Sequence, residues 1–317
     1  MTQREAILSK TNIYRIFALL GLLTFLLSGI HAQPAGYEHR KLITLNSSQI
    51  DGSVAHTNFP VMVKLTDADL KSTGNGGGVV NPSGYDIVFT QKDGSTLLDH
   101  ELQNYAASTG DLLCWVRLPS LSPTVNDTIF LYYGKTGIYS DQSVVSTWNA
   151  NYLSVWHLED LTDSSPNGNT FTDHSTATNS SGYLGSAREF DGDGDDLEDL
   201  NGATYLNGLS NLSISLWAKA NAIGTDRGLF YGDDPDASER RVGLRHDASG
   251  DNGGQANVFR SAMRVDNAGT TRNQRSQSST SSATANWQHL TLTRADGTRP
   301  NLYIDGGYDT PSWDILK

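Results

Sequence analysis

The chain has 317 residues, a length typical of two domains. Its formal net charge is -12, from 23 Lys and Arg against 35 Asp and Glu. This balance argues against a surface for nucleic acid or anionic membranes, because both need a basic stripe. The 31 glycines, and the absence of a long apolar helical period after residue 35, predict an all-β protein with many turns.

Residues 1–32 have the composition of a signal peptide. Three basic residues lie before the unbroken apolar run Ile16–Ile30, which is shorter than the roughly 20 residues of a bilayer span. We therefore expect cleavage after Ala32 and a mature chain without a membrane span. This chain would be secreted or at the cell surface, with the periplasm as the alternative. An uncleaved membrane anchor is the other interpretation of the segment.

Residues 37–147 form the first predicted module, a β-sandwich. Apolar and polar residues alternate in Phe59–Leu65, Leu112–Leu118 and Ile129–Tyr133, so each strand offers one face to a core. Turns rich in Gly, Asn and Asp separate the strands. The only cysteine, Cys114, alternates with leucines and a valine. This pattern predicts a small buried hydrophobe and not a nucleophile.

Residues 148–317 form the second predicted module, again of strands joined by polar loops. Trp217 and Trp287 lie in patterned strands and are expected in its core. We expect a loop at Gln277–Asn286, a stretch rich in Ser, Thr and Ala. The predicted strands are Leu153–Leu158, Ala187–Phe190, Leu212–Ala218, Arg227–Tyr231, Arg241–Arg245, Asn257–Val265, Trp287–Arg294 and Pro300–Ile304.

Both modules resemble known families. In the first, the runs HRKLITLN (39–46), YDIVFT (85–90), LLCWVRLPSLSP (112–123) and TIFLYYGK (128–135) resemble a bacterial family known as domain of unknown function 2341. The resemblance crosses the junction, where such chains read like NANYLSVWHL (149–158). The second module resembles a laminin-G-like, concanavalin A-type jelly roll. The runs that carry this resemblance are GSAREFDGDGDDLE (185–198), NLSISLWAKA (211–220), NWQHLTLTR (286–294) and NLYIDG (301–306).

The second resemblance also implies that the sequence is incomplete at its C-terminal end. Jelly rolls of this type continue past the YIDG strand with further strands, whereas this sequence ends at Lys317. The expected fold is therefore all-β: a β-sandwich followed by a jelly roll that lacks its last strands.

We assign no catalytic residues and expect a protein that is not an enzyme. Glucanases on the concanavalin-type scaffold carry E-x-D-x-E on one strand, which brings two carboxylates together on one sheet face. The sequence lacks this motif. The carboxylates in the two LEDL runs, Leu158–Leu161 and Leu197–Leu200, are adjacent, so on a strand they point to opposite faces. His100, between Asp99 and Glu101, is the best candidate base, but we expect it at the surface for the same reason.

The acidic run Asp191–Asp199 (DGDGDDLED) is the strongest local signal. Its alternate carboxylates have the spacing of a calcium loop, but the glycine and the glutamate that an EF-hand needs are absent. The first interpretation is a turn between two strands. The alternative is a calcium ion bound at Asp193, Asp195 or Asp196. We expect the protein to require no cofactor, with Ca²⁺ as the candidate metal ion.

The second module is also rich in arginine. A guanidinium forks onto the carboxylate or sulfate of an acidic polysaccharide, although a solvated face balanced by nearby Asp and Glu is the simpler interpretation. Tyr and Trp near turns are suited to reach a sugar ring. The candidate ligand-binding residues are Tyr231, Arg241, Arg245, Tyr308 and Trp313.

We interpret the chain as an exported binding protein whose jelly roll recognises carbohydrate or a cell-surface protein, as in adhesion. Two alternatives stay open. The resemblance also implies the periplasmic sensing or scaffold part of a proton-channel-type protein that energises transport. The third interpretation is a pair of targeting modules from a polysaccharide hydrolase whose catalytic domain is missing.

Overall fold

The computed structural model describes residues 33–175, 177–206, 208–232, 242–248, 256–267, 270–278, 282–296 and 298–309. The predicted signal peptide lies outside these residues. The chain divides into two compact units, Met1–Tyr152 (unit 1) and Leu153–Lys317 (unit 2). The division follows Tyr152, whereas the sequence placed it before Trp148. Of the helices described, none has the length and apolar character needed to cross a bilayer.

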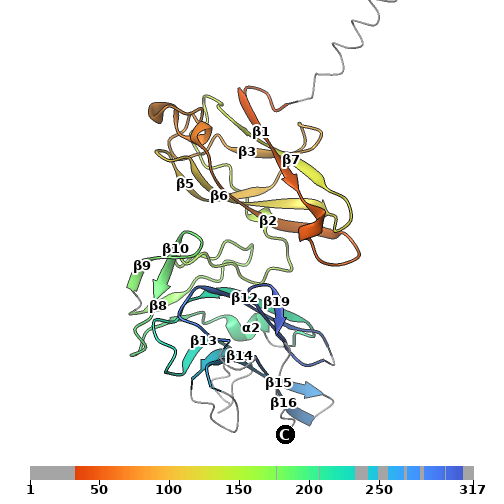
Figure 1. Ribbon diagram of the computed structural model, residues 1–317, viewed down its shortest axis with the longest axis vertical. Coiled ribbons are helices and arrows are strands. Elements are labelled where there is room, and N and C mark those ends of the chain that lie inside the picture. Colours follow the sequence, from red (N-terminus) through yellow and green to blue (C-terminus); the bar gives the residue numbers. More distant parts are fainter. Residues whose placement is uncertain are drawn as a thin grey trace, which may run out of the picture. The chain divides into compact units, whose positions relative to one another are not determined.

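Unit 1 is a two-sheet sandwich (Figure 1). One antiparallel sheet has the order β1-β7-β3-β4 and the other has the order β2-β6-β5. The strands are β1 His39–Leu45, β2 His56–Thr66, β3 Val88–Gln91, β4 Leu97–Leu98, β5 His100–Ala106, β6 Asp111–Leu121 and β7 Asp127–Tyr133. Short 3-10 helices occupy Ser47–Gln49 (η1), Ala68–Leu70 (η2), Thr73–Asn75 (η3) and Val145–Thr147 (η4).

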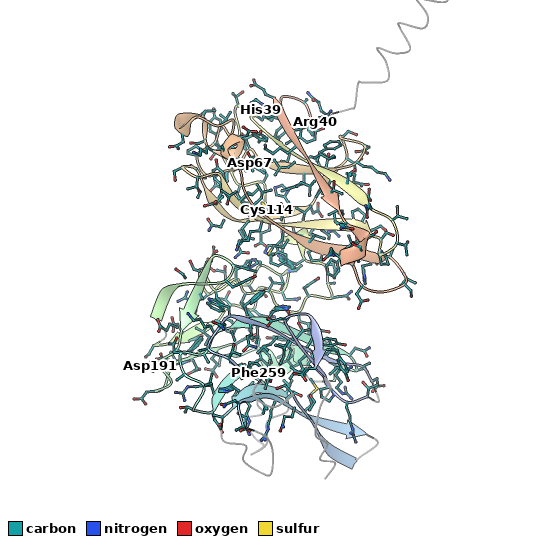
Figure 2. The ribbon with its side chains drawn as sticks, viewed as in Figure 1. His39, Arg40, Asp67, Cys114, Asp191 and Phe259 are labelled. Atoms are coloured by element: carbon teal, nitrogen blue, oxygen red, sulfur yellow. The ribbon has the colours of Figure 1, made fainter. Side chains whose placement is uncertain are left out.

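The core of unit 1 lies between these sheets and follows the predicted alternation. Leu112, Cys114, Val116 and Leu118 of β6 are all at most 2% exposed and pack with Leu131 of β7. Cys114 is fully buried among the side chains of unit 1 (Figure 2). The prediction of a buried cysteine is confirmed.

The prediction that His100 lies at the surface is wrong. His100 pairs with Val116 in the β5–β6 ladder, so its side chain points to the core face. It is 5% exposed, and its ring meets Phe89 edge-on with centroids 5.5 Å apart. Burial lowers the pKa of His100 and outweighs the opposing effect of the Leu98 carbonyl.

A buried aspartate, Asp86, connects two loops of unit 1 through hydrogen bonds. The side chain of Asp86 is completely buried. Its carboxylate accepts hydrogen bonds from the backbone N–H groups of Val80 at 2.9 Å, Asn81 at 2.8 Å and Gly134 at 2.9 Å. These bonds join the loop before β3 to the turn after β7, a connection that neither sheet provides.

Unit 2 contains a pair of larger antiparallel sheets with the orders β12-β17-β18-β19 and β13-β14-β15-β16, and two small strand pairs, β10-β9 and β11-β8. Its elements are β8 Thr172–His174, β9 Ala177–Ser181, β10 Ser186–Glu189, β11 Asp196–Glu198, α2 Gly202–Leu206, β12 Leu212–Ala218, β13 Arg227–Gly232, β14 Val242–Asp247, β15 Val258–Asn267, β16 Thr270–Gln277, β17 Gln288–Arg294, β18 Asn301–Ile304 and β19 Gly307–Asp309.

The core of unit 2 lies between its two larger sheets. Leu216, Leu290 and Leu302 from the first sheet pack with Leu244 and Phe259 from the second. Most of the predicted strands are confirmed, and the residues described after Gln277 form a loop as expected.

The prediction of a strand at Leu153–Leu158 is wrong. Side chains form hydrogen bonds with the backbone N–H and C=O groups that would otherwise pair with a neighbouring strand. The carboxylate of Asp163 accepts from the N–H of Val155 at 2.8 Å and from the N–H of Asn169 at 2.8 Å. The carbonyl of Leu153 accepts from the side-chain amide of Asn169 at 3.0 Å. This aspartate-centred segment opens unit 2.

We predict that Asp86→Ala lowers the free energy of unfolding of unit 1 by at least about 3 kcal/mol, because the substitution leaves three backbone N–H groups without their acceptor. Equilibrium urea unfolding measures the loss. Asp51→Ala is the control. Asp51 is exposed, so its removal should cost less than about 1 kcal/mol. Equal effects from the two substitutions would contradict the anchoring role.

Unit 1 should also lose stability in mild acid through His100. Above its ordinary pKa of 6.5 this imidazole is neutral in both states. Below that pH the unfolded chain takes up a proton that the folded chain excludes, so stability falls until the lower folded pKa is reached. His100→Gln should flatten this fall when urea unfolding is compared between pH 7 and 5. The half-exposed His174 gives the control substitution His174→Gln, which should keep the fall.

Candidate functional site

The outer face of the β12-β17-β18-β19 sheet carries aromatic and hydroxyl side chains. Within β12, Leu216 packs into the core, and its neighbours Ser215 and Trp217 point to the opposite face because strand side chains alternate. The register places Trp217 beside His289 and Ser215 beside Thr291. Thr291 in turn pairs with Tyr303.

Five rings gather on this outer face. Tyr183 stacks on Trp217 with centroids 3.7 Å apart and planes 18° apart, and Trp217 lies 5.0 Å from His289. Tyr303 and Tyr308 form a second contact at 5.4 Å. Tyr183 is 46% exposed and Tyr308 is 52% exposed. We call these five residues the aromatic face.

Polar groups lie between the rings of the aromatic face. One ring nitrogen of His289, Nε2, is 2.8 Å from the hydroxyl of Ser215, and the hydroxyl of Thr291 donates to the same oxygen at 3.4 Å. Burial lowers the pKa of His289 although Asp305 opposes the shift. The imidazole is therefore neutral at pH 7 and offers one donor and one acceptor.

Most residues of the aromatic face lie where the sequence pattern did not lead us to expect a site. Trp217 was expected in the core, but it lies on the outer face because it is out of phase with Leu216. Trp287 is only partly buried. The sequence does contain a pattern that predicts the outward position of Trp217 and His289. In NLSISLWAKA and NWQHLTLTR these two residues alternate with leucines, so they point away from the core that the leucines form.

The outer face of the other large sheet holds Tyr231. Its residues Val242 and Leu244 face the core, so Gly243 faces outward and pairs with Tyr231. The tyrosine ring lies over two glycines. A methyl group on Gly243 would lie 2.9 Å from two of the ring carbons, and one on Gly228 would overlap the ring. The ring therefore lies flat against the backbone.

Next to Tyr231, two arginines share one buried carboxylate. Asp247 is completely buried, and its Oδ2 atom lies 2.8 Å from a nitrogen of Arg245 and also contacts Arg260. Arg260 donates through Nε to the side-chain oxygen of Gln277 at 2.8 Å. We call these four residues the arginine cluster. Arg245, Arg260 and Gln277 are successive partners across three strands, so they share one face.

The structure thus brings together only part of the predicted ligand set. Tyr231 and Arg245 share an outer face, since Arg245 lies two residues after Gly243 on the same strand, about 7 Å along it. Tyr308 belongs to the aromatic face on the other sheet. Arg241 and Trp313 lie outside the described residues.

The acidic run forms the turn that its sequence predicted, between β10 and β11. The carboxylates cap this turn: the N–H of Asp191 donates to Asp195 at 2.8 Å, and the N–H of Asp193 donates to Asp191 at 2.7 Å. Among the residues that the structure describes, no three His, Cys, Asp or Glu side chains come together as a metal site. Calcium at Asp193, Asp195 or Asp196 stays a prediction.

Comparison with known proteins confirms the two resemblances in the predicted order. Residues 83–173 match the family Domain of unknown function (DUF2341), and residues 191–310 match the Concanavalin A-like lectin/glucanases superfamily, as a laminin-G-type domain. The first match covers β3 to β7 of unit 1 and the Asp163 segment that opens unit 2. No curated protein and no solved structure matches the chain.

We predict that Gly243→Ala destabilises unit 2 by about 1 to 3 kcal/mol, because the new methyl group meets the ring of Tyr231. The double substitution Gly243→Ala with Tyr231→Ala should show less than the sum of the two single losses, since the clash disappears with the ring. Thermal or urea unfolding measures each variant. Gly224→Ala, which meets nothing within 4 Å, is the control. Additive losses would contradict the flat placement of Tyr231.

Proposed function

We propose that this chain is an exported carbohydrate-binding protein that holds a glycan on the aromatic face of unit 2 without transforming it. The match of residues 191–310 to the Concanavalin A-like lectin/glucanases superfamily is compatible with carbohydrate binding. The fold of that superfamily hosts both binding proteins and enzymes, so the proposal rests on the side chains of the site.

The observation that carries the proposal is the exposed stack of Tyr183 on Trp217 beside a neutral imidazole. A sugar ring has apolar C–H faces and a rim of hydroxyl groups. Exposed aromatic rings complement the C–H faces, and the Ser215, Thr291 and His289 groups complement the hydroxyl rim, since each of them both donates and accepts. Four of the five rings lie on strands of one sheet and are held in place before the ligand arrives, which lowers the entropy cost of binding, whereas Tyr183 comes from the loop between β9 and β10.

Two sequence features support a role in binding outside the cytoplasm. The signal-peptide-like residues 1–32 favour secretion or the cell surface, with the periplasm as the alternative. The absence of an E-x-D-x-E motif favours binding over glycoside hydrolysis, since that reaction needs two carboxylates on one face.

The proposal is tested on a glycan array with the mature chain, followed by titration of the best ligand. Tyr183→Ala and Tyr308→Ala should each weaken binding at least about fivefold, because an aromatic contact contributes about 1 kcal/mol. The matched control is Tyr139→Ala, which removes an 87% exposed tyrosine of unit 1 and should leave the affinity unchanged.

Three outcomes would overturn this function. One is an array without any bound glycan, and another is equal weakening by Tyr139→Ala. The third is release of reducing sugar from the bound glycan, which would make the chain an enzyme.

A further inference from the structure

Unit 1 has a cavity of its own at the end of its sandwich. The cavity has a volume of about 310 Å³ and is lined by His39, Asp69, Tyr133 and the three glycines 76–78. His39 begins β1 and Tyr133 ends β7, so both lie at one end of the sheet. The other residues come from the loop that follows β2. His39 and Asp67 lie in the same part of unit 1 (Figure 2).

The two rings of this cavity form one wall. His39 and Tyr133 are paired in the β1–β7 ladder, and their rings stack with centroids 5.1 Å apart and planes 29° apart. Tyr133 is only 4% exposed, whereas His39 is exposed. A ligand in the cavity therefore meets the imidazole of His39.

The glycine loop packs against these two rings and completes the lining of the cavity, and this close packing requires glycine. A methyl group on Gly78 would lie 2.8 Å from His39 and 2.9 Å from Tyr133. Gly76 has a φ of 85°, which side chains rarely adopt. The N–H of Gly78 donates to the carbonyl of Asp69 at 2.8 Å, which ties the loop to itself. The cavity is thus formed before any ligand binds.

Charges of both signs lie side by side at this end of the unit. The ammonium group of Lys41 lies 2.7 Å from a carboxylate oxygen of Asp67 and 2.8 Å from one of Asp69. The side chain of Asp69 is 71% exposed, compared with 24% for Lys41. The two carboxylates outnumber the single ammonium group, and Asp69 is the member of this set that lines the cavity, so an anionic ligand is repelled.

We propose that this cavity is a second ligand site, which takes one neutral sugar residue or a polyol of similar size. Each hydroxyl group of such a ligand both donates and accepts, so it can bond to the Asp69 carboxylate and the His39 ring, which both line the cavity, without placing a negative charge beside Asp69. The volume is at the lower end of the range for small-molecule sites, about 300 to 1,000 Å³. This site is independent of the glycan proposed for unit 2.

The test is a chemical footprint of His39 on the full chain. Diethyl pyrocarbonate modifies accessible histidines, and mass spectrometry gives the rate at each position. Neutral sugars (glucose, galactose or mannose) should slow modification of His39 several-fold. Modification of the half-exposed His174 in unit 2 should not change. Glucuronate, which is anionic, should protect His39 less, because its carboxylate is repelled by Asp69. Maltotriose and cellotriose, set against glucose, distinguish the end of a glycan chain from a free sugar.

Substitutions link the protection to the cavity. Asp69→Asn should raise the sugar concentration needed for half-protection about tenfold or more, because a charge-assisted hydrogen bond is lost. Lys41 keeps its partner Asp67 in this variant, so the fold is retained, and circular dichroism checks it. The control is Asp51→Asn, an exposed carboxylate outside the cavity. No protection by any neutral sugar, stronger protection by glucuronate, or an equal effect of the control would overturn the site.

Discussion

An aspartate that accepts hydrogen bonds from backbone N–H groups organises the irregular segment of each unit. Asp86 does so in unit 1, and Asp163 does so at the start of unit 2. The chain has one cysteine, so no internal disulfide can hold these segments. A buried carboxylate holds each segment instead, because charged acceptors form stronger hydrogen bonds than neutral ones. These bonds fix the conformation of loops that the hydrogen bonds between strands do not include.

In unit 1 this constraint extends to the cavity. Asp86 accepts hydrogen bonds from Val80, just after the glycine loop, and from Gly134, just after Tyr133, so one side chain fixes both segments that line the cavity. The aromatic face of unit 2 depends on a different constraint, the register of β12 against β17 and of β17 against β18. A shift of one residue would send Trp217 and His289 into the core and the leucines to solvent.

Strict alternation made parts of the fold predictable. The strand Leu212–Ala218 was predicted with its observed bounds, because every second residue is apolar. The strand Thr270–Gln277 was missed, because TTRNQRSQ is polar on both faces and its ladder with β15 forms the strand. The site was less predictable. Tyr231 and Arg245 were named, but the stack of Tyr183 on Trp217 depends on a loop folding over a strand. No local pattern encodes that contact.

The folded chain should not react with thiol reagents, because its one cysteine, Cys114, is buried. It is fully buried, and burial raises its pKa well above the ordinary value, so no thiolate is presented at neutral pH. Since the sequence has no second cysteine, a single cysteine placed on the surface of either unit would carry a fluorophore or spin label alone. The natural chain thus already provides the background needed to label either unit at one chosen position.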